Sequence, residues 1–361
     1  MDMDNLIKNI DDETIKVRTK SLDISFNELY DMYKDGELII SPEYQRLFRW
    51  EDEKQSRFIE SLILEMPIPP IFVIETDNGV YELIDGLQRI STYLRFRGES
   101  LGIKESNLIL SGCDIVKGLN DKSFDDLPKT LQIKLKRSFV RMEVIKKESS
   151  ISLKYHMFKR LNNGGELLSD QEIRNCTIRL IGSKYIDFLD ECTKYENFKI
   201  AINRLQKEKK EKRYDQELVL RYLALKNSIN TYKFPVTEFL TKYLENITKE
   251  QVSFDIVKEQ YIFKKTFDFI SKNWKSDAFS AIMTNGQPRN EFYLYYFDAI
   301  TIAIAKNIDD IEKTNTSKEI VAAIDIAKKS NELNLHKTGS VENVKARIAL
   351  FSREVESIIG C

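Results

Sequence analysis

The spacing of hydrophobic and polar positions changes near residue 150. Before that point, short runs with helical spacing alternate with β-branched runs that are typical of strands. The Asn78-Gly79 pair between two of the β-rich runs predicts a hairpin turn. The pattern predicts helices over residues 26–33 and 55–64 and strands over 71–74, 80–84 and 139–145.

From about Ser150 onward the spacing is helical almost throughout. Ser169-Asp170-Gln171-Glu172 has the form of a capping box, and the helix that it opens is expected to end near Gly182. We therefore expect an α+β chain, with a mixed α/β domain over residues 1–149 and an all-helical domain over 150–361. Further helices are predicted over residues 216–226, 236–246, 254–274, 290–306, 317–329 and 341–359.

Composition excludes several classes of protein. The 361 residues include 56 Lys and Arg and 57 Asp and Glu, so the formal net charge is −1, which argues against a surface coated in positive charge but leaves a local basic face open. The four cysteines form no CxxC pair, which excludes a zinc ribbon and favours reduced thiols. The acidic start at Met1-Asp2 is unlike a signal peptide. The longest apolar stretch, 292–305, is shorter than the ~18 residues of a membrane span, so we expect a cytoplasmic protein with no membrane partner.

The sequence has two histidines, His156 and His336, far apart in the chain. Zinc hydrolases and Ser-His-Asp enzymes depend on well-supported histidines. We therefore expect any chemistry to use Arg, Asp, Glu, Gln and backbone groups.

The sharpest local motif is Ile84-Asp85-Gly86-Leu87-Gln88-Arg89, where a predicted strand gives way to a predicted helix. Such a junction directs backbone N–H groups and the positive end of the helix dipole at one point, and this arrangement favours an anion. Gln88 and Arg89 stand in the first helical turn, where a guanidinium can bind phosphate oxygens in a forked geometry. The alternative is an Asp-Gly hairpin turn with Arg89 on the surface, and the motif alone leaves both interpretations open.

Two further segments concentrate polar and aromatic residues. The first runs from Pro42 to Trp50, where Arg46 beside Gln45 would complete a phosphate pocket while the aromatic residues enter the core. The second runs from Phe158 to Asn175 and contains an Asn-Asn-Gly-Gly turn that gathers N–H groups. A glycine-rich loop followed by a capping box explains its backbone, but not the density of Gln, Glu, Arg and Asn.

Taken in order, these segments resemble the N-terminal region of GmrSD-type modification-dependent restriction proteins, whose fold is related to ParB and sulfiredoxin. The similarity continues more weakly through residues 213–221, Arg289-Asn290 and a final helix with Arg347. The specific motifs are Pro42-x-Tyr44-Gln45-Arg46-x-Phe48-x-Trp50, Ile68-Pro69-Pro70, Ile84-Asp85-Gly86-x-Gln88-Arg89 and Leu161-Asn162-x-Gly164-Gly165-x-x-Leu168-x-x-Gln171-Glu172-x-Arg174-Asn175.

The resemblance implies a ParB/sulfiredoxin-like nucleotide-binding sensor that acts in phage defence by licensing DNA cleavage. In this family the Asp-Gly-x-Gln-Arg motif is associated with binding and hydrolysis of nucleoside triphosphates. The family most often has Gln where this chain has Leu87. Many relatives also carry a C-terminal nuclease built on paired histidines, whereas this chain has only His336 near its end. Cleavage of DNA is therefore expected to need either another polypeptide, such as a separate nuclease or ATPase subunit, or an unusual site without histidine.

These considerations assign expected roles at the site. Gly86 and the N–H groups after it would hold phosphate, Arg89 and Arg46 would balance developing charge, Asp85 would hold Mg²⁺, and Gln88 would orient the attacking water. Glu172 and Arg174 would close the pocket from the helical domain. The remaining predicted binding residues are Tyr44, Gln45, Asn162 and Gly164.

Two alternatives remain open. A non-enzymatic DNA-binding module would use the basic cluster Lys134, Lys136, Arg137 and Arg141 together with residues 207–213. A metal-dependent DNA nickase would use Asp85 and nearby carboxylates. Helical domains with exposed apolar faces often self-associate, so a homo-oligomer is a further open expectation.

Overall fold

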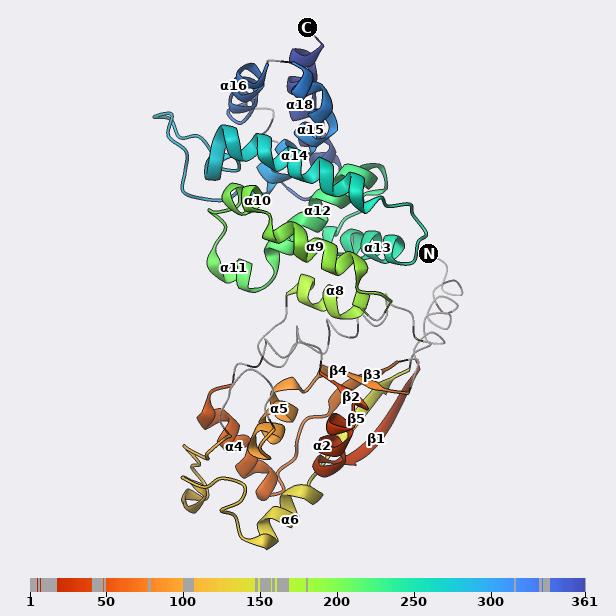
Figure 1. Cartoon of the computed structure of the whole chain (residues 1–361), viewed down its shortest axis with the longest axis vertical. Helices are drawn as coiled ribbons and strands as arrows, with labels where there is room; N and C mark the ends of the chain where they lie inside the picture. Colours follow the sequence, from red (N-terminus) through yellow and green to blue (C-terminus); the bar gives the residue numbers. More distant parts are fainter. Residues whose placement is uncertain are drawn as a thin grey trace. The chain divides into compact units, whose positions relative to one another are not determined.

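A computed structural model gives the fold, and it divides the chain into two compact units, residues 1–167 and 168–361 (Figure 1). The predicted domain boundary at 149/150 lies before this division, and nearly all residues between the two points are outside the described set, so the boundary stays a prediction. The structure describes residues 18–40, 48, 50–76, 79–99, 107–146, 149, 169–179, 181–314, 316–330, 333 and 338–360, together with residues 5, 7, 157 and 160.

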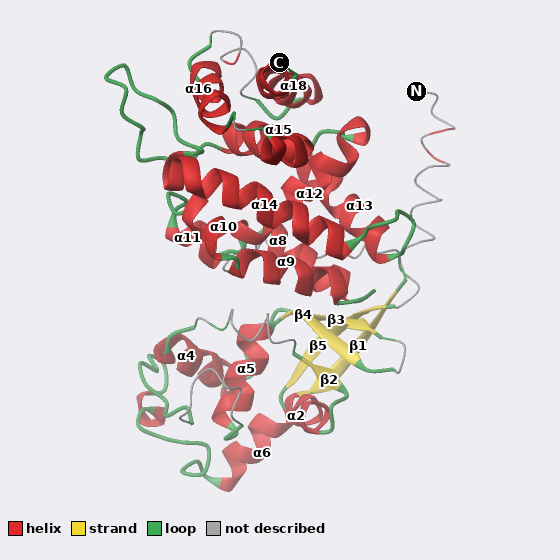
Figure 2. Cartoon of the chain, turned by 45° about the horizontal axis from the view of Figure 1, so that its top comes forward, coloured by secondary structure: helices red, strands yellow, loops and turns green. Residues whose placement is uncertain are grey.

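The first unit contains a five-stranded sheet in the order β1-β5-β3-β4-β2 (Figure 2). The pairs β1–β5 and β3–β4 are antiparallel, and the pairs β3–β5 and β2–β4 are parallel. The strands are β1 (Thr19–Ser25), β2 (Leu38–Ile39), β3 (Ile71–Glu75), β4 (Tyr81–Asp85) and β5 (Phe139–Ile145).

Three of these strands, β3, β4 and β5, confirm the sequence prediction. The predicted hairpin joins β3 to β4, with Gly79 at a φ of 74° and the Thr76 N–H donating to the Val80 carbonyl at 2.8 Å. The other two strands are not predicted by the pattern. β1 is an edge strand in which no residue is fully buried, and β2 has only two residues, so neither imposes a clear alternation on the sequence.

Burial in β5 alternates along the strand, with Val140, Met142 and Val144 buried and Phe139 and Arg141 exposed. The buried face belongs to the core of the unit, because alternate residues of a strand point to opposite faces of the sheet.

Among the described residues of the first unit, four α-helices accompany the sheet, and they pack on one another. The side chain of Ser25 caps the first of them by accepting the Glu28 N–H at 3.1 Å, and Phe26 at its start packs against Phe58 and Tyr93. The fourth helix covers the basic stretch before β5 and is not predicted by the pattern. The helices are α2 (Phe26–Lys34), α4 (Asp52–Ile63), α5 (Leu87–Phe96) and α6 (Lys129–Arg137), with a 3₁₀ turn η1 (Lys117–Leu119).

The described residues of the second unit form helices and no named strand, which confirms the α+β class expected for the chain (Figure 2). The helices predicted from the hydrophobic spacing are all present, whereas three helices between residues 184 and 211 are not predicted. The elements are α8 (Asp170–Arg179), α9 (Lys184–Lys194), α10 (Glu196–Ala201), α11 (Lys207–Glu211), α12 (Tyr214–Ser228), η3 (Ile229–Thr231), α13 (Val236–Thr248), α14 (Ile256–Trp274), η4 (Lys275–Asp277), α15 (Leu294–Lys313), α16 (Ser317–Ala327) and α18 (Val341–Ile359).

Helix α12 lies in the core of this unit, where it packs against α8, α9, α13 and α15. Every residue from Leu218 to Leu225 is buried, including Arg221. A helix that is buried on all sides has no polar face, which explains why its pattern is only weakly amphipathic.

A buried ion cluster joins three helices of the second unit. Asp298 of α15 accepts hydrogen bonds from Arg221 of α12, with an Nη2–Oδ2 distance of 2.7 Å, and from Arg347 of α18. The Asp298 side chain is completely buried, and the two arginine side chains are at most 4% exposed. Arg221 and Arg347 belong to the segments of weaker family similarity, and here they hold α12 and α18 to α15.

Among the helices of the described residues, none combines the length and the apolar character needed to cross a membrane.

Candidate functional site

The junction between β4 and α5 is built around Gly86, which has a φ of 103°. A Cβ at this position would lie 2.5 Å from the Cγ2 of Ile71, so both the backbone conformation and the space require glycine. The first bond of the α5 ladder joins the Ile90 N–H to the Gly86 carbonyl at 2.9 Å. The amides of residues 87–89 precede that bond and therefore have no acceptor within the helix.

Arg89 lies beside this helix start and is held there by two acceptors. Its Nη2 atom is 2.9 Å from Oδ2 of Asp85 and 3.1 Å from the carbonyl oxygen of Pro70. The Arg89 side chain is 16% exposed and that of Asp85 is 38% exposed. The Nε atom of Arg89 is buried and has no hydrogen-bond partner among the described residues.

These facts decide between the two interpretations of the motif. A helix begins directly after Gly86, and Arg89 is largely covered, so the interpretation as a hairpin turn with a surface arginine is wrong. The predicted junction of strand, glycine and helix is confirmed. The anion itself stays a prediction.

Gln88 contacts the end of the aromatic motif. Its Oε1 atom accepts the main-chain N–H of Trp50 at 3.1 Å, and the Trp50 carbonyl accepts Nε2 of Gln55 at 2.7 Å. The main chain of Trp50 is thus held from both sides. The oxygen of Gln88 has a protein partner in this structure, and its predicted role in orienting water stays a prediction.

The junction between β4 and α5, called the β4–α5 corner below, offers few ligands for a metal ion. The described residues contain no group of three or more His, Cys, Asp or Glu side chains that could hold one. Asp85 offers one carboxylate, of which Oδ2 binds Arg89. Mg²⁺ typically binds through one or two carboxylates together with substrate phosphates and water. A single carboxylate fits an Mg²⁺ ion that arrives with a phosphate chain, and the contact through Asp85 stays a prediction.

The predicted binding residues Tyr44, Gln45, Arg46, Asn162 and Gly164 lie outside the described residues. Their predicted roles are therefore not tested by the structure.

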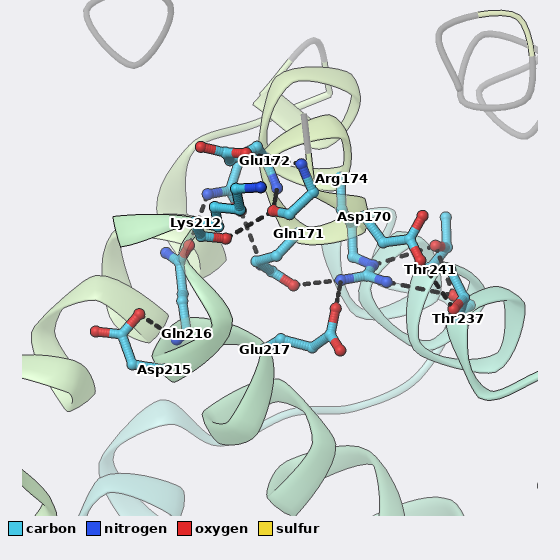
Figure 3. A network of polar contacts seen from close by, with 12 residues as sticks. Asp170, Gln171, Glu172, Arg174, Lys212, Asp215, Gln216, Glu217, Thr237 and Thr241 are labelled. Carbon is cyan, nitrogen blue, oxygen red and sulfur yellow. Dashed lines mark hydrogen bonds and ion pairs between the residues drawn. The ribbon is translucent and has the colours of Figure 1, made fainter. Parts of the chain in front are cut away.

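Helix α8, in the second unit, carries the remaining predicted residues (Figure 3). The capping box is confirmed, because Glu172 Oε2 accepts the Ser169 N–H at 2.7 Å and Ser169 Oγ accepts the Glu172 N–H at 3.2 Å. The Ser169 hydroxyl also donates to the Lys212 carbonyl at 2.6 Å. Glu172 thus fixes the start of α8.

Arg174 is fully buried, and its guanidinium binds neighbours within the second unit (Figure 3). Its Nε donates to Thr241 Oγ1 at 3.1 Å, its Nη1 lies 3.5 Å from Glu217 Oε2, and its Nη1 also donates to Gln171 Oε1. Arg174 therefore ties α8 to α12 and α13. Its predicted role in closing a nucleotide pocket stays a prediction.

Asn175 extends this network by donating from Nδ2 to Gln216 Oε1 at 2.6 Å. Next to Gln216, burial raises the pKa of the Asp215 carboxyl above its ordinary value. The network explains the density of polar residues in the third motif, which the sequence left without an explanation. A helical spacing of i, i+3 and i+4 places Gln171, Arg174 and Asn175 on one face of α8. This spacing indicates that the three side chains share a polar contact surface.

Comparison with known families identifies the region that contains both sites. Residues 26–179 match the family described as the N-terminal domain of the GmrSD restriction endonuclease. The match begins with α2 and ends with α8, so it includes the β4–α5 corner and the motif on α8. Searches of curated proteins and of solved structures gave no match. Residues 26–179 of this chain are therefore similar to the N-terminal domain of the GmrSD restriction endonuclease.

Proposed function

We propose that the β4–α5 corner binds the phosphates of a nucleoside triphosphate, and that the chain is an NTP-hydrolysing sensor in a restriction system. The family supports a role in restriction and defence, and hence an interaction with DNA. The observation that carries the finer proposal is the position of Arg89. This arginine is largely buried at the amino end of a helix, and its Nε has no partner among the described residues.

Binding at this corner follows from its electrostatics. The first-turn amides of α5 and the positive end of its dipole favour an anion, and the Arg89 guanidinium adds a full positive charge. Of the Asp85–Arg89 ion pair, the Arg89 guanidinium is the partner that would bind phosphate. An incoming phosphate oxygen would compete with Asp85 Oδ2 for Nη2 and would also give Nε a partner.

Hydrolysis at the same corner requires little covalent chemistry from the protein. Water attacks the terminal phosphorus, the bond to the bridging oxygen breaks, and its electron pair leaves with the diphosphate while the water loses a proton. Arg89 would stabilise the charge that spreads over the phosphoryl oxygens. Mg²⁺, contacted by Asp85, would supply further neutralisation of phosphate charge when it is bound.

The proposed role of nucleotide binding and hydrolysis is to regulate a partner protein that cleaves DNA. The 361 residues contain two histidines that are far apart in the sequence, so we propose that a nuclease with paired catalytic histidines acts as a partner of this region and does not lie within it. Nucleotide occupancy would then license DNA cleavage by that nuclease, and an ATPase subunit is a further candidate partner.

The structure gives less support to the alternative of a DNA-binding module based on the predicted basic cluster. Lys134 pairs with Glu65 at 3.3 Å, and Arg141 pairs with Asp23 at 3.1 Å. Part of the positive charge of the cluster is therefore balanced by neighbouring acids.

A phosphate-release assay on the full chain tests the proposal, with and without added DNA. We expect the wild type to hydrolyse the nucleotide and Arg57→Ala to do so at the same rate. The rate in Arg89→Ala should fall at least about ten-fold, because one charge-assisted hydrogen bond is worth about 1.5 to 3 kcal/mol. Arg57 is an exposed arginine of the same unit and serves as the matched control. Equal turnover in the wild type and Arg89→Ala would contradict the proposal.

A further inference from the structure

A hairpin projects from the second unit between η4 and α15 (Figure 2). Its two arms pair antiparallel at Ile282 and Pro288, and the Met283 N–H donates to the Gln287 carbonyl at 2.8 Å. The Gly286 N–H closes the turn by donating to the Met283 carbonyl at 2.9 Å. These bonds lie within the hairpin itself, so its shape is set in advance of any contact with a partner.

The base of the hairpin is anchored in the helical core. The Tyr293 N–H donates to the Phe279 carbonyl at 2.9 Å, and the Ser280 hydroxyl donates to the Glu291 carbonyl at 2.9 Å. The Phe279 ring is buried, and its centroid lies 5.0 Å from that of Phe297 in α15. The hairpin therefore has a fixed position on the second unit.

The tip of the hairpin is exposed and carries no charge. It consists of residues 283–287, Met-Thr-Asn-Gly-Gln, and all five are exposed. Asn285 Oδ1 accepts the Gln287 N–H at 3.0 Å, which holds the turn. The side chain of Gln287 has no hydrogen bond within the described part of the chain, so its amide can both donate to and accept from a partner.

A basic surface adjoins the base of the hairpin. Residues 207–213 contain five Lys and Arg and two Glu, so their net charge is +3, and no residue of α11 is buried. Arg204, just before this segment, donates to the Arg289 carbonyl of the hairpin and to Asp277 of η4. Both views show α11 and the hairpin on the same side of the second unit (Figures 1 and 2).

The positive charge of this surface is only partly balanced. Arg213 pairs with Asp190 at 3.0 Å, and one lysine of α11 lies 3.7 Å from a glutamate of the same helix. Lys210 and Lys212 form no ion pair with any described residue. Their ammonium groups can therefore bind an anionic partner without first breaking an ion pair.

We infer that this hairpin and the basic surface beside it bind duplex DNA, with the hairpin in the major groove and the lysines on the phosphates. The major groove is about 12 Å wide and admits a two-stranded ribbon. At about 3.3 Å per residue, the four steps from Ala281 to Asn285 reach up to about 13 Å, which exceeds the groove depth of about 8.5 Å. A glutamine amide matches the N6 and N7 atoms of adenine, which assigns the base contact to Gln287.

Other polyanions fit this surface less well. Duplex RNA has a deep and narrow major groove that side chains cannot read, and an acidic protein would not require an uncharged tip. The choice of DNA rests on the proposed function in a restriction system, but none of these residues belongs to the β4–α5 corner. The hairpin and the basic surface also lie outside residues 26–179, which match the family.

Fluorescence anisotropy of a short labelled DNA duplex with the full chain tests the phosphate contacts, over a range of salt concentrations and with or without ATP and Mg²⁺. We expect Lys210→Gln/Lys212→Gln to bind at least about ten-fold more weakly than the wild type. The slope of log affinity against log salt should become shallower by about 1.8, because each phosphate contact contributes about 0.9 to it.

Lys242→Gln/Lys258→Gln is the matched control, since both lysines are exposed and belong to the same unit. Lys242 lies on α13, and Lys258 lies in the first turn of α14. About 24 Å of helix separate Lys258 from Trp274, after which the chain leads into the hairpin. This control should keep the wild-type affinity and slope.

The base contact is tested with A·T-rich and G·C-rich DNA duplexes and with an RNA duplex. We expect the wild type to prefer A·T-rich DNA at least about five-fold and to bind the RNA at least about ten-fold more weakly. Gln287→Ala should lose the preference for A·T-rich DNA while keeping the salt slope. Gln251→Ala, which alters an exposed glutamine of the same unit, should keep both.

Equal affinities and slopes for Lys210→Gln/Lys212→Gln and its control would overturn the basic surface as a DNA contact. No preference for A·T-rich DNA in the wild type, a preference that survives in Gln287→Ala, or equal binding of DNA and RNA would overturn the groove contact. A wild type that binds nucleotide but no DNA would overturn this inference and leave the β4–α5 corner intact. A wild type that binds DNA but no nucleotide would overturn the nucleotide proposal alone.

Discussion

At the scale of single residues, the site depends on a glycine that no other residue replaces without strain. Gly86 combines a φ of 103° with a close approach to Ile71, and it sets the direction in which α5 leaves the sheet. Its neighbour Arg89 is held on the same side by Asp85 and the Pro70 carbonyl. The backbone conformation and the charge of this junction therefore come from one five-residue stretch, Asp85 to Arg89.

Substitution of Gly86 by alanine is predicted to destabilise the first unit. The added Cβ meets Ile71 at 2.5 Å, whereas alanine at Gly79, which has a φ of 74°, meets no atom within 4 Å. Strain alone costs about 1 to 2 kcal/mol, and overpacking adds about 1 to 3 kcal/mol. Urea denaturation should show the larger loss for Gly86→Ala, and equal losses in the two variants would contradict this account of the corner.

Two buried thiols predict a fall in stability at alkaline pH. Burial raises the pKa of Cys113 to about 11 and that of Cys192 to about 12, from an ordinary value near 9. The folded state thus keeps a proton that the unfolded state releases, so the free energy of unfolding is unaffected below pH 9 and falls as the pH rises toward these values. Urea titrations across this range should show a shallower fall in Cys192→Ala than in the wild type. Parallel curves would be inconsistent with a buried neutral thiol.

At the scale of elements, α8 shows what a motif can and cannot reveal. The capping box at Ser169 and Glu172 is readable from the sequence, because both partners lie within one helical turn. The partners of Arg174 lie on α12 and α13, more than forty residues away, and no local pattern specifies them. The dense polar residues were therefore visible from sequence, but their structural role required the fold.

Arg174→Lys is predicted to destabilise the second unit by about 2 to 4 kcal/mol, because a lysine cannot reproduce the forked bonds and leaves buried acceptors unpaired. Arg179→Lys on the same helix is the control, since Arg179 is 23% exposed and pairs with a largely exposed Asp187. Thermal unfolding followed by circular dichroism measures both. Comparable midpoints for the two variants would show that the Arg174 network does not hold α8 in place.

At the scale of the whole chain, the hydrophobic period was enough to predict a mixed α/β region followed by a helical region. The long helices α13, α14 and α18 are predicted directly, because each has one buried and one exposed side over most of its length. Helix α15 differs, because every residue from Tyr296 to Ala305 is buried. Strand β1 was missed because it is an edge strand without a fully buried residue. Pairing between β1 and β5 joins residues more than a hundred positions apart, which no local window contains.

The ion cluster around Asp298 is the long-range contact with the largest predicted effect on the second unit. Asp298→Asn would leave the buried charges of Arg221 and Arg347 without their counter-ion, at a cost of about 3 to 5 kcal/mol. Asp310→Asn, on the same helix and in an exposed pair with Lys313, should leave the unfolding midpoint unchanged. A midpoint for Asp298→Asn equal to that of Asp310→Asn would refute the structural role of the cluster.

The most direct test of the central claim is a binding isotherm of the purified full chain with a nucleoside triphosphate and Mg²⁺. We predict saturable binding to the wild type and to Arg57→Ala, and a Kd raised about 10- to 100-fold in Arg89→Ala, because the guanidinium contributes about 1.5 to 3 kcal/mol to a bound phosphate. Identical isotherms for the wild type and Arg89→Ala, or no saturable binding to the wild type, would contradict a phosphate site at the start of α5.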